Sequence, residues 1–264
     1  MGLFRSLLLL LLLALSAVAS AAPFHSLLRA VPEDPAPGRS TDGEGVADRL
    51  FCDSWRLSVE TNDAGYWRTI PQKCLKFVED YVNGDRYASD FDVISSESLS
   101  FAETVPIAGD GKDVWIFDID ETLLSNVPYY AINGYGSEVF NETSFDEWVD
   151  LARAPALPAS LRLYEELIGL GFQMVLLTGR SENQRNSTEN NLLYAGYHSW
   201  ITLILRQTSD LGKPALVYKS ERRAALEAQG FRIHGSSGDQ WSDLLGLPLA
   251  KRSFKLPNPM YYVD

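Results

Sequence analysis

The sequence predicts an α/β protein, a parallel sheet with helices on both faces. Three observations lead to this prediction. Short apolar runs typical of buried strands recur from residue 114 onward, amphipathic helical segments separate them, and glycines follow the helices. Because parallel strands are joined by helical crossovers of one hand, such alternation gives one sheet covered on both faces.

The strands and helices of this region can be assigned in order. The expected strands are VWIFD (114–118), FQMVLL (172–177), WITLIL (200–205) and FRIHG (231–235). The expected helices are PASLRLYEELIGLG (158–171), SENQRNSTENNLLYAG (181–196) and SERRAALEAQG (220–230). Ser181 is the expected N-cap of the second helix, and each helix ends at a glycine.

Length, composition and charge limit the class of protein. A chain of 264 residues is long enough for one full hydrophobic core, with or without a small extra lobe. Its 45% hydrophobic and 22% charged residues are typical of a globular protein. The formal net charge of -12 argues against nucleic acid as a partner and fits an ordinary hydrated acidic surface.

Residues 1–21 have the pattern of a secretory signal peptide. Arg5 precedes a leucine run, and a small-residue cleavage site follows at residues 19–21. A signal anchor is the alternative, but the run is short for a bilayer span. No other run could cross a membrane, so no membrane association is expected after signal removal. Residues 22–45, rich in proline, glycine and acids, are expected to be a mobile leader.

Entry into the secretory pathway would permit a disulfide and N-glycosylation, and the sequence contains candidate residues for both. Cys52 and Cys74 are the only cysteines, and an even count in a secreted chain predicts a disulfide between them, with two free thiols as the alternative. Asn141 and Asn186 begin the glycosylation sequons NET and NST. Asn186 lies in a predicted helix, which makes it the weaker acceptor of the two.

The alternating strands and helices are expected to form a main domain at residues 111–264. Two further segments do not follow the alternation: one precedes this domain and one is inserted in it. Residues 46–110 are expected to form an N-terminal extension with a helix at 72–84, and its aromatic residues are expected to be core. Residues 127–154 follow the first strand and are aromatic and turn-rich. An insertion at the carboxyl end of a strand is where an α/β fold places a lid or pocket wall.

Acidic and polar motifs follow three of the expected strands. DIDET (118–122) follows the first, TGR (178–180) the second and GDQWSD (238–243) the fourth. The carboxyl ends of parallel strands meet at one edge of a sheet, where ligands bind. A lone DxD is as often a turn or a helix N-cap. Four aspartates on one edge, however, form an oxygen-only set that suits Mg²⁺: Asp118, Asp120, Asp239 and Asp243.

The ordered set of motifs in residues 113–245 resembles the haloacid dehalogenase (HAD) superfamily of phosphatases. Further stretches narrow the resemblance: CDSWRLSVETNDAGYWRTIPQKC, FDIDETLLSNVPYYA, FDEWV, APALP, LTGRSENQRNSTENNLLYAGY, YKSERR and GDQWSDLLG. They are similar to the secreted plant acid phosphatases related to vegetative storage proteins, from about residue 52 to the C terminus. The resemblance implies a HAD-like fold and an extracellular or vacuolar protein.

The resemblance also implies a role for each motif residue. Asp118 would attack phosphorus to form an aspartyl-phosphate, and Asp120 would act as general acid and then general base. Thr178 and Gly179 would bind the phosphoryl oxygens. Lys219, whose YKS sequence fits the family better than that of Lys213, would offset the phosphoryl charge. Mg²⁺ would be held by Asp118, the backbone carbonyl of Asp120, Asp239 and Asp243.

Several points stay open at this stage. Thr122 is expected to brace the loop, Arg180 either contacts phosphate or caps its own loop, and His234 is expected to be a packed residue. The favoured function is a Mg²⁺-dependent acid phosphatase acting on small phosphomonoesters, with residues 127–154, Tyr129 and Tyr130 above all, shaping substrate choice. The alternative is a vegetative storage protein with little or no catalytic role. Whether the chain forms a homodimer is left open.

Overall fold

The structure is a computed structural model that describes residues 42–264. The expected signal peptide and the leader as far as residue 41 lie outside the described residues. Residues 42–45, expected in the leader, are the first turn of helix α2 (Asp42–Glu60). Residues 44–264 form one compact unit. Among the described residues, no helix combines the length and the apolar character that a bilayer span requires.

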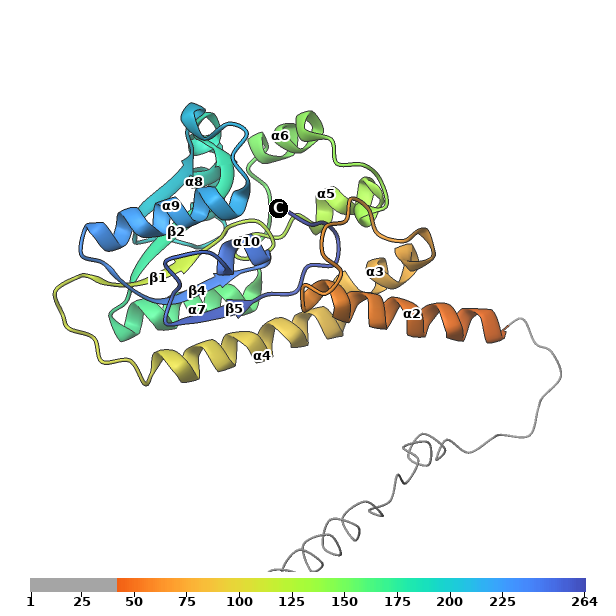
Figure 1. The fold of residues 1–264 in the computed structure, drawn as a ribbon, viewed down its shortest axis with the longest axis horizontal. Helices are drawn as coiled ribbons and strands as arrows, with labels where there is room; N and C mark the ends of the chain where they lie inside the picture. The colour runs from red at the N-terminus through yellow and green to blue at the C-terminus, as the bar shows by residue number, and fades with distance from the viewer. Residues whose placement is uncertain (1–41) are drawn as a thin grey trace, which may run out of the picture. The chain divides into compact units, whose positions relative to one another are not determined.

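The centre of the fold is a five-stranded parallel sheet with the strand order β3-β2-β1-β4-β5 (Figure 1). The strands are β1 (Asp113–Phe117), β2 (Gln173–Ser181), β3 (Trp200–Arg206), β4 (Arg232–Gly238) and β5 (Arg252–Lys255). Along the chain, β2 is added beside β1 and β3 beside β2, and β4 then pairs with the other side of β1. The strand order therefore reverses between β1 and β4, and an α/β sheet binds its ligands at such a point.

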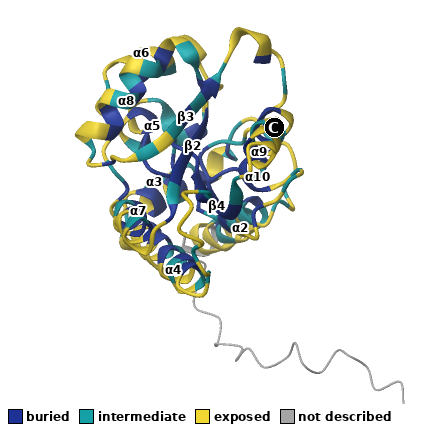
Figure 2. Cartoon of the chain, turned by 90° about the vertical axis from the view of Figure 1, so that its left-hand side faces the viewer, coloured by how far each residue is buried: buried dark blue, intermediate teal, exposed yellow. Residues whose placement is uncertain are grey.

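Helices cover both faces of the sheet, as the sequence predicts. The helices of the alternating region are α7 (Pro158–Leu170), α8 (Arg185–Tyr194) and α9 (Ala215–Ala228). Trp115 and Phe117 of β1 pack with residues of α7 and α8 on one face. Val114 and Ile116 pack with residues of α9 on the other. Figure 2 shows the strands buried between helices whose outer faces are exposed.

Helix α9 begins five residues earlier than predicted. The sequence places the start at Ser220, a residue type that favours N-caps. In the structure the Ser220 hydroxyl donates instead to the carbonyl of Leu216, 2.6 Å away, as serines inside helices do. Lys219 therefore lies within the helix and not in the loop before it.

The N-terminal extension contains two long helices that the sequence analysis does not assign. They are α2 and α4 (Asp85–Ala102), and the shorter α3 (Leu75–Val82) lies between them. The buried positions of α4 are Tyr87, Phe91, Ser95, Ser98 and Ala102. Three of these five are serine or alanine, so the buried face carries little hydrophobic pattern. Strand β5 is also missed, because only one of its four residues, Phe254, is apolar.

The extension, the insertion after β1 and the C-terminal tail share one hydrophobic cluster. The insertion forms α5 (Val127–Ile132) and α6 (Glu142–Asp150). The cluster joins Ile70 and Phe91 of the extension to Tyr130 of α5 and Met260 of the tail. The expected disulfide is present: Cys52 of α2 is bonded to Cys74, and both are buried. The bond ties α2 to the turn Gln72–Cys74 that precedes α3.

The contact between Gly235 and Trp115 gives a stability prediction. A Cβ atom at Gly235 would lie 2.3 Å from the Trp115 indole, which is fully buried and donates to Ser237. Gly235→Ala should therefore destabilise the protein by about 1–3 kcal/mol through overpacking. Gly169→Ala is the control, because a Cβ there meets nothing within 4 Å on the exposed side of α7. It should stabilise by about 0.5–1 kcal/mol. Urea unfolding measures both, and equal effects would contradict the packing argument.

Candidate active site

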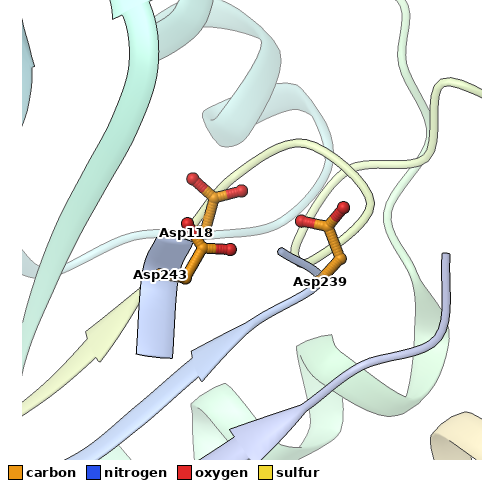
Figure 3. Close-up of side chains that lie close together, drawn as sticks. All are labelled: Asp118, Asp239 and Asp243. Atoms are coloured by element: carbon orange, nitrogen blue, oxygen red, sulfur yellow. The ribbon is translucent and has the colours of Figure 1, made fainter. Parts of the chain in front are cut away.

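The acidic motifs converge where the strand order reverses. Asp118 follows β1 and Asp239 follows β4, while Asp243 lies in the short helix α10 (Trp241–Leu244). All three are buried, and each offers one oxygen within 4.8 Å of the others. Figure 3 shows the three carboxyl groups directed into the same space beyond the strand ends. Neighbouring buried carboxylates repel one another, so this arrangement requires a cationic partner.

Lys219 supplies one such partner. Its buried ammonium donates to Asp118 Oδ1 at 2.5 Å and also to Asp243. Burial opposes the charge on this lysine, but Asp118 and Asp243 outweigh burial and raise the pKa of Lys219 above its ordinary value. Lys213 pairs instead with Asp210 and Glu221 and is partly exposed. The structure thus brings Lys219, and not Lys213, to the acidic cluster.

Arg180 is the partner of Asp120. Its Nη2 donates to Asp120 Oδ1 at 2.7 Å, and the guanidinium is buried. The Asn126 amide also donates to Asp120, at 2.8 Å. Burial opposes the charge of Asp120, but Arg180 and Asn126 prevail and hold the pKa of the Asp120 carboxyl below its ordinary value. Arg180 thus pairs with Asp120, which is neither of the two roles expected from the sequence, and contact with phosphate stays a prediction.

Glu121 is a site residue that the sequence analysis does not assign. It is fully buried, with a left-handed backbone (φ 50°) that non-glycine residues rarely adopt. Its carboxyl group accepts from the Tyr261 hydroxyl at 2.5 Å and from the Asn126 backbone N–H at 2.5 Å. Burial and the charge of Asp120 raise the pKa of Glu121 to about 7. The sequence feature that could have indicated Glu121 is its position as the third acidic residue of DIDET.

Asp239 is held by groups from the C-terminal part of the chain. Its carboxylate accepts from the Gln240 and Asn258 side-chain amides, each at 2.7 Å. The Thr122 hydroxyl lies 3.4 Å from the same carboxylate, in line with the expected bracing role. Burial, followed by the charges of Asp243 and Glu121, raises the pKa of Asp239 to about 7. A bound cation would lower this pKa, because opposite charge favours the carboxylate.

The TGR motif divides between the floor of the site and the layer beneath it. Gly179 lines the cavity described below, and a Cβ there would meet nothing within 4 Å. Thr178 is fully buried, and its hydroxyl accepts from the Arg180 backbone N–H at 3.1 Å. His234 is buried and bonded to Asp113 at the opposite end of β1. It is therefore the packed residue that the sequence predicts.

The charges of the site do not balance among the described residues. Two buried cations, Lys219 and Arg180, face five carboxylates, so three formal negative charges remain when all are ionised. The carboxylates are Asp118, Asp120, Glu121, Asp239 and Asp243. The oxygen-only donors of Asp118, Asp239 and Asp243 lie close enough to share one ion. The residues present therefore fit a hard divalent cation such as Mg²⁺.

A cavity of about 970 Å³ opens above these acids. Asp118, Asp120 and Lys219 line it together with residues of the extension, the insertion and the tail. Tyr130 lines the cavity and stacks on Tyr261, with ring centroids 5.2 Å apart. Its neighbour Tyr129 is not among the lining residues and is buried against other aromatic rings of the insertion. Of the two tyrosines expected to shape substrate choice, only Tyr130 lines the cavity.

Both sequon asparagines are exposed. Asn141 is the N-cap of α6, and its side chain accepts from the Ser144 backbone N–H at 3.1 Å. Asn186 lies in helix α8, as the sequence predicts, and in the structure it is in the first turn. Glycosylation of either residue stays a prediction.

The parallel sheet, with acids beyond the ends of its strands, is the arrangement that the resemblance to the HAD superfamily implies. The fold is similar to that of the class C acid phosphatase from Bacillus anthracis, with a TM-score of 0.60 and 20% identity over 71% of this chain and 85% of that chain. The family model of the HAD superfamily, subfamily IIIB (acid phosphatase), matches residues 39–264. The chain belongs to this family of acid phosphatases.

Two relatives from plants match most of the chain. Acid phosphatase 1 of Solanum lycopersicum is 55% identical over 218 residues, which are 83% of this chain and 86% of that protein. Vegetative storage protein 1 of Arabidopsis thaliana is 36% identical over 264 residues, 98% of this chain and 97% of that protein. Both expected relationships, to acid phosphatases and to vegetative storage proteins, are confirmed.

The two lysines give a second stability prediction. Lys219→Met should destabilise the metal-free protein by about 3–5 kcal/mol, because Asp118 and Asp243 would stay buried without their cation. Lys213→Met, at a partly exposed lysine, should change the free energy of unfolding much less. Urea unfolding in the presence of a chelator measures both. If both variants lower the free energy of unfolding equally, the prediction that the buried ion pairs of Lys219 contribute more is wrong.

Proposed function

We propose that this protein is a Mg²⁺-dependent acid phosphatase that hydrolyses phosphomonoesters through an aspartyl-phosphate on Asp118. The observation that carries this proposal is the position of Asp118, at the floor of a cavity and 2.5 Å from the Lys219 ammonium. Asp120 lies two residues further on and lines the same cavity. A nucleophile, a candidate acid and a cation therefore meet at one point.

In the proposed reaction Asp118 attacks phosphorus, and the bond to the leaving alcohol breaks. Asp120 gives its proton to that alcohol and later takes a proton from the water that cleaves the acyl phosphate. Lys219 offsets the charge of the phosphoryl oxygens. The backbone of Gly179, which is open to the cavity, would bind the phosphoryl oxygens. Thr178, buried directly before it, is proposed to contribute its hydroxyl to the same phosphate site. Asn126 and Arg180 hold Asp120 in place between the two steps.

Asp118, Asp239 and Asp243, with the backbone carbonyl of Asp120, would hold the Mg²⁺ ion. When bound, the ion would supply positive charge beside the transferring phosphoryl group. The carboxylates proposed to bind the ion are held in position by other side chains of the protein. Gln240 and Asn258 orient Asp239, and Lys219 bridges Asp118 to Asp243.

A storage role is the second candidate, because a relative that matches 98% of this chain is a vegetative storage protein. Loss of a catalytic residue would favour storage alone. All six proposed catalytic and metal residues are present: Asp118, Asp120, Thr178, Lys219, Asp239 and Asp243. This complete set favours the enzyme. We further propose that the protein is secreted or vacuolar, with glycans on Asn141 and, less readily, on Asn186.

Substitutions of the two motif aspartates test the mechanism. Asp118→Asn should abolish release of phosphate from 4-nitrophenyl phosphate, because an amide is a poor nucleophile. Asp120→Asn should lower turnover by about 10²–10⁴-fold, because the amide supplies no proton. On rapid quench the parent protein should carry a hydroxylamine-labile phosphate that Asp118→Asn lacks. Melting temperatures provide the control for folding. That of Asp118→Asn should hold or rise, because Lys219 keeps its pair with Asp243, whereas Asp120→Asn leaves the buried Arg180 without its carboxylate and should lower it. Parental activity in Asp118→Asn would overturn the assignment.

Metal binding has a test that does not depend on activity. Mg²⁺ at about 100 times its dissociation constant should stabilise the native state by about 2.7 kcal/mol and raise the melting temperature. Asp239→Asn should lose most of this shift. Glu165→Gln, which removes one exposed negative charge from α7, should keep it. A shift that survives in Asp239→Asn, or none in the parent protein, would contradict the proposed metal site.

A further inference from the structure

The cavity is much larger than a phosphate group requires. Its volume of about 970 Å³ is at the upper end for sites that enclose a whole drug-sized ligand. Asp118, Lys219 and Asp243 occupy only its floor. The remaining space is available for the alcohol part of a phosphomonoester, which is released in the proposed reaction.

Apolar side chains surround this outer space. We call it the outer subsite and define it by Tyr66, Trp67, Val139, Phe140, Phe145, Leu211 and Tyr262. Tyr66 is 64% exposed, Val139 77%, Phe140 54% and Leu211 77%. Large apolar side chains left exposed around one cavity mark a binding surface. They belong to four separate segments, so the grouping is a product of the fold and not of a local sequence run.

We propose that the outer subsite binds an aromatic leaving group and that residues 61–71 of the N-terminal extension form its specificity-determining wall. This inference rests on the proposed phosphatase function. The wall contributes Tyr66 and Trp67, and it lies within the loop that the Cys52–Cys74 disulfide closes. Residues far from the reacting atoms would thus select the substrate.

The wall is fixed in position before any substrate binds. Trp67 packs edge-on against Trp55 of α2, with ring centroids 5.4 Å apart. Tyr66 packs edge-on against Tyr262 of the tail at 5.9 Å. The Ile70 backbone N–H donates to the Gly136 carbonyl of the insertion at 2.9 Å. The extension, the tail and the insertion therefore hold the wall jointly, and a preorganised wall lowers the entropy cost of binding.

The chemistry of the outer subsite favours a ring over a polyol. Several polar side chains at its edge already have partners. Asp146 accepts from Gln184 at 2.7 Å, and Glu182 accepts from Arg185 at 2.5 Å and from Gln207 at 2.8 Å. Arg68, Asn183 and Thr208 also line the cavity, but its exposed lining is more apolar than polar. Aromatic rings gain edge-to-face and offset contacts on such surfaces, whereas hydroxyl groups would lose hydration without full compensation.

Tyr66→Ala tests the wall directly, because Tyr66 is exposed and its removal leaves no buried cavity. We expect kcat/KM for 1-naphthyl phosphate to fall about 3- to 10-fold and that for glycerol 2-phosphate to change less than about 2-fold. Tyr66→Phe should keep the preference for the naphthyl substrate. Tyr194→Ala is the matched control, since Tyr194 is 85% exposed and does not line the cavity.

The insertion side of the outer subsite can be tested in the same way. Phe140→Ala should also reduce the preference for 1-naphthyl phosphate. Ile132→Ala is its control, because Ile132 is 84% exposed at the end of α5 and is absent from the cavity lining. Equal losses on both substrates, or equal effects in the control variants, would overturn the proposal.

A binding measurement separates this inference from the proposed function. Calorimetric titration with 1-naphthylmethylphosphonate and with methylphosphonate needs no turnover. If the parent protein hydrolyses no phosphomonoester, the proposed function fails. The outer subsite still stands if Tyr66→Ala weakens binding of the naphthyl phosphonate about 3- to 10-fold and leaves methylphosphonate unchanged. Unchanged binding of the naphthyl phosphonate would overturn the outer subsite, whatever the activity.

Discussion

The mutual repulsion of carboxylates beyond β1 and β4 is the constraint on which the rest of the structure depends. Five acids meet where the strand order reverses, and each has a partner that offsets its charge or satisfies its oxygens. Lys219 of α9 serves two acids and Arg180 of β2 serves one. Because a buried charge without a partner costs several kcal/mol, these cationic side chains cannot move independently of the acids.

The same constraint fixes the irregular parts of the chain. Residues 256–264 contain no helix or strand, yet Asn258 and Met260 are buried. Asn258 donates to Asp239 through its side chain and to Glu60 of α2 through its backbone, at 2.7 and 3.0 Å. Tyr261 donates to Glu121. The tail thereby connects the acids to the extension. Tyr262 of the tail also packs against Tyr66, so the same network helps to position the wall.

The sequence predicts what is local and misses what is assembled from distant segments. Four strands and the acids beside them could be predicted, because an apolar run followed by aspartate is contiguous in the chain. Helix α4 could not, since serine and alanine fill three of its five buried positions. The partners Tyr261 and Asn258 lie 140 and 19 residues from the acids they bind, so no spacing rule indicates them. Family resemblance favours Lys219 over Lys213, and only the fold shows that the Lys219 ammonium reaches Asp118.

The Arg180–Asp120 pair implies that the substrate completes the catalytic apparatus. Arg180 holds the pKa of Asp120 low, yet the first step of the proposed reaction needs a protonated acid. A phosphoryl group beside Asp118 brings negative charge close to Asp120 and gives Arg180 a second anion to bind. Both effects raise the pKa of Asp120. A bound phosphate ester would therefore favour the protonated form of Asp120, while the proposed Mg²⁺ ion would act on the same pKa in the opposite direction. In the proposed reaction, acid catalysis is thus linked to occupancy of the cavity.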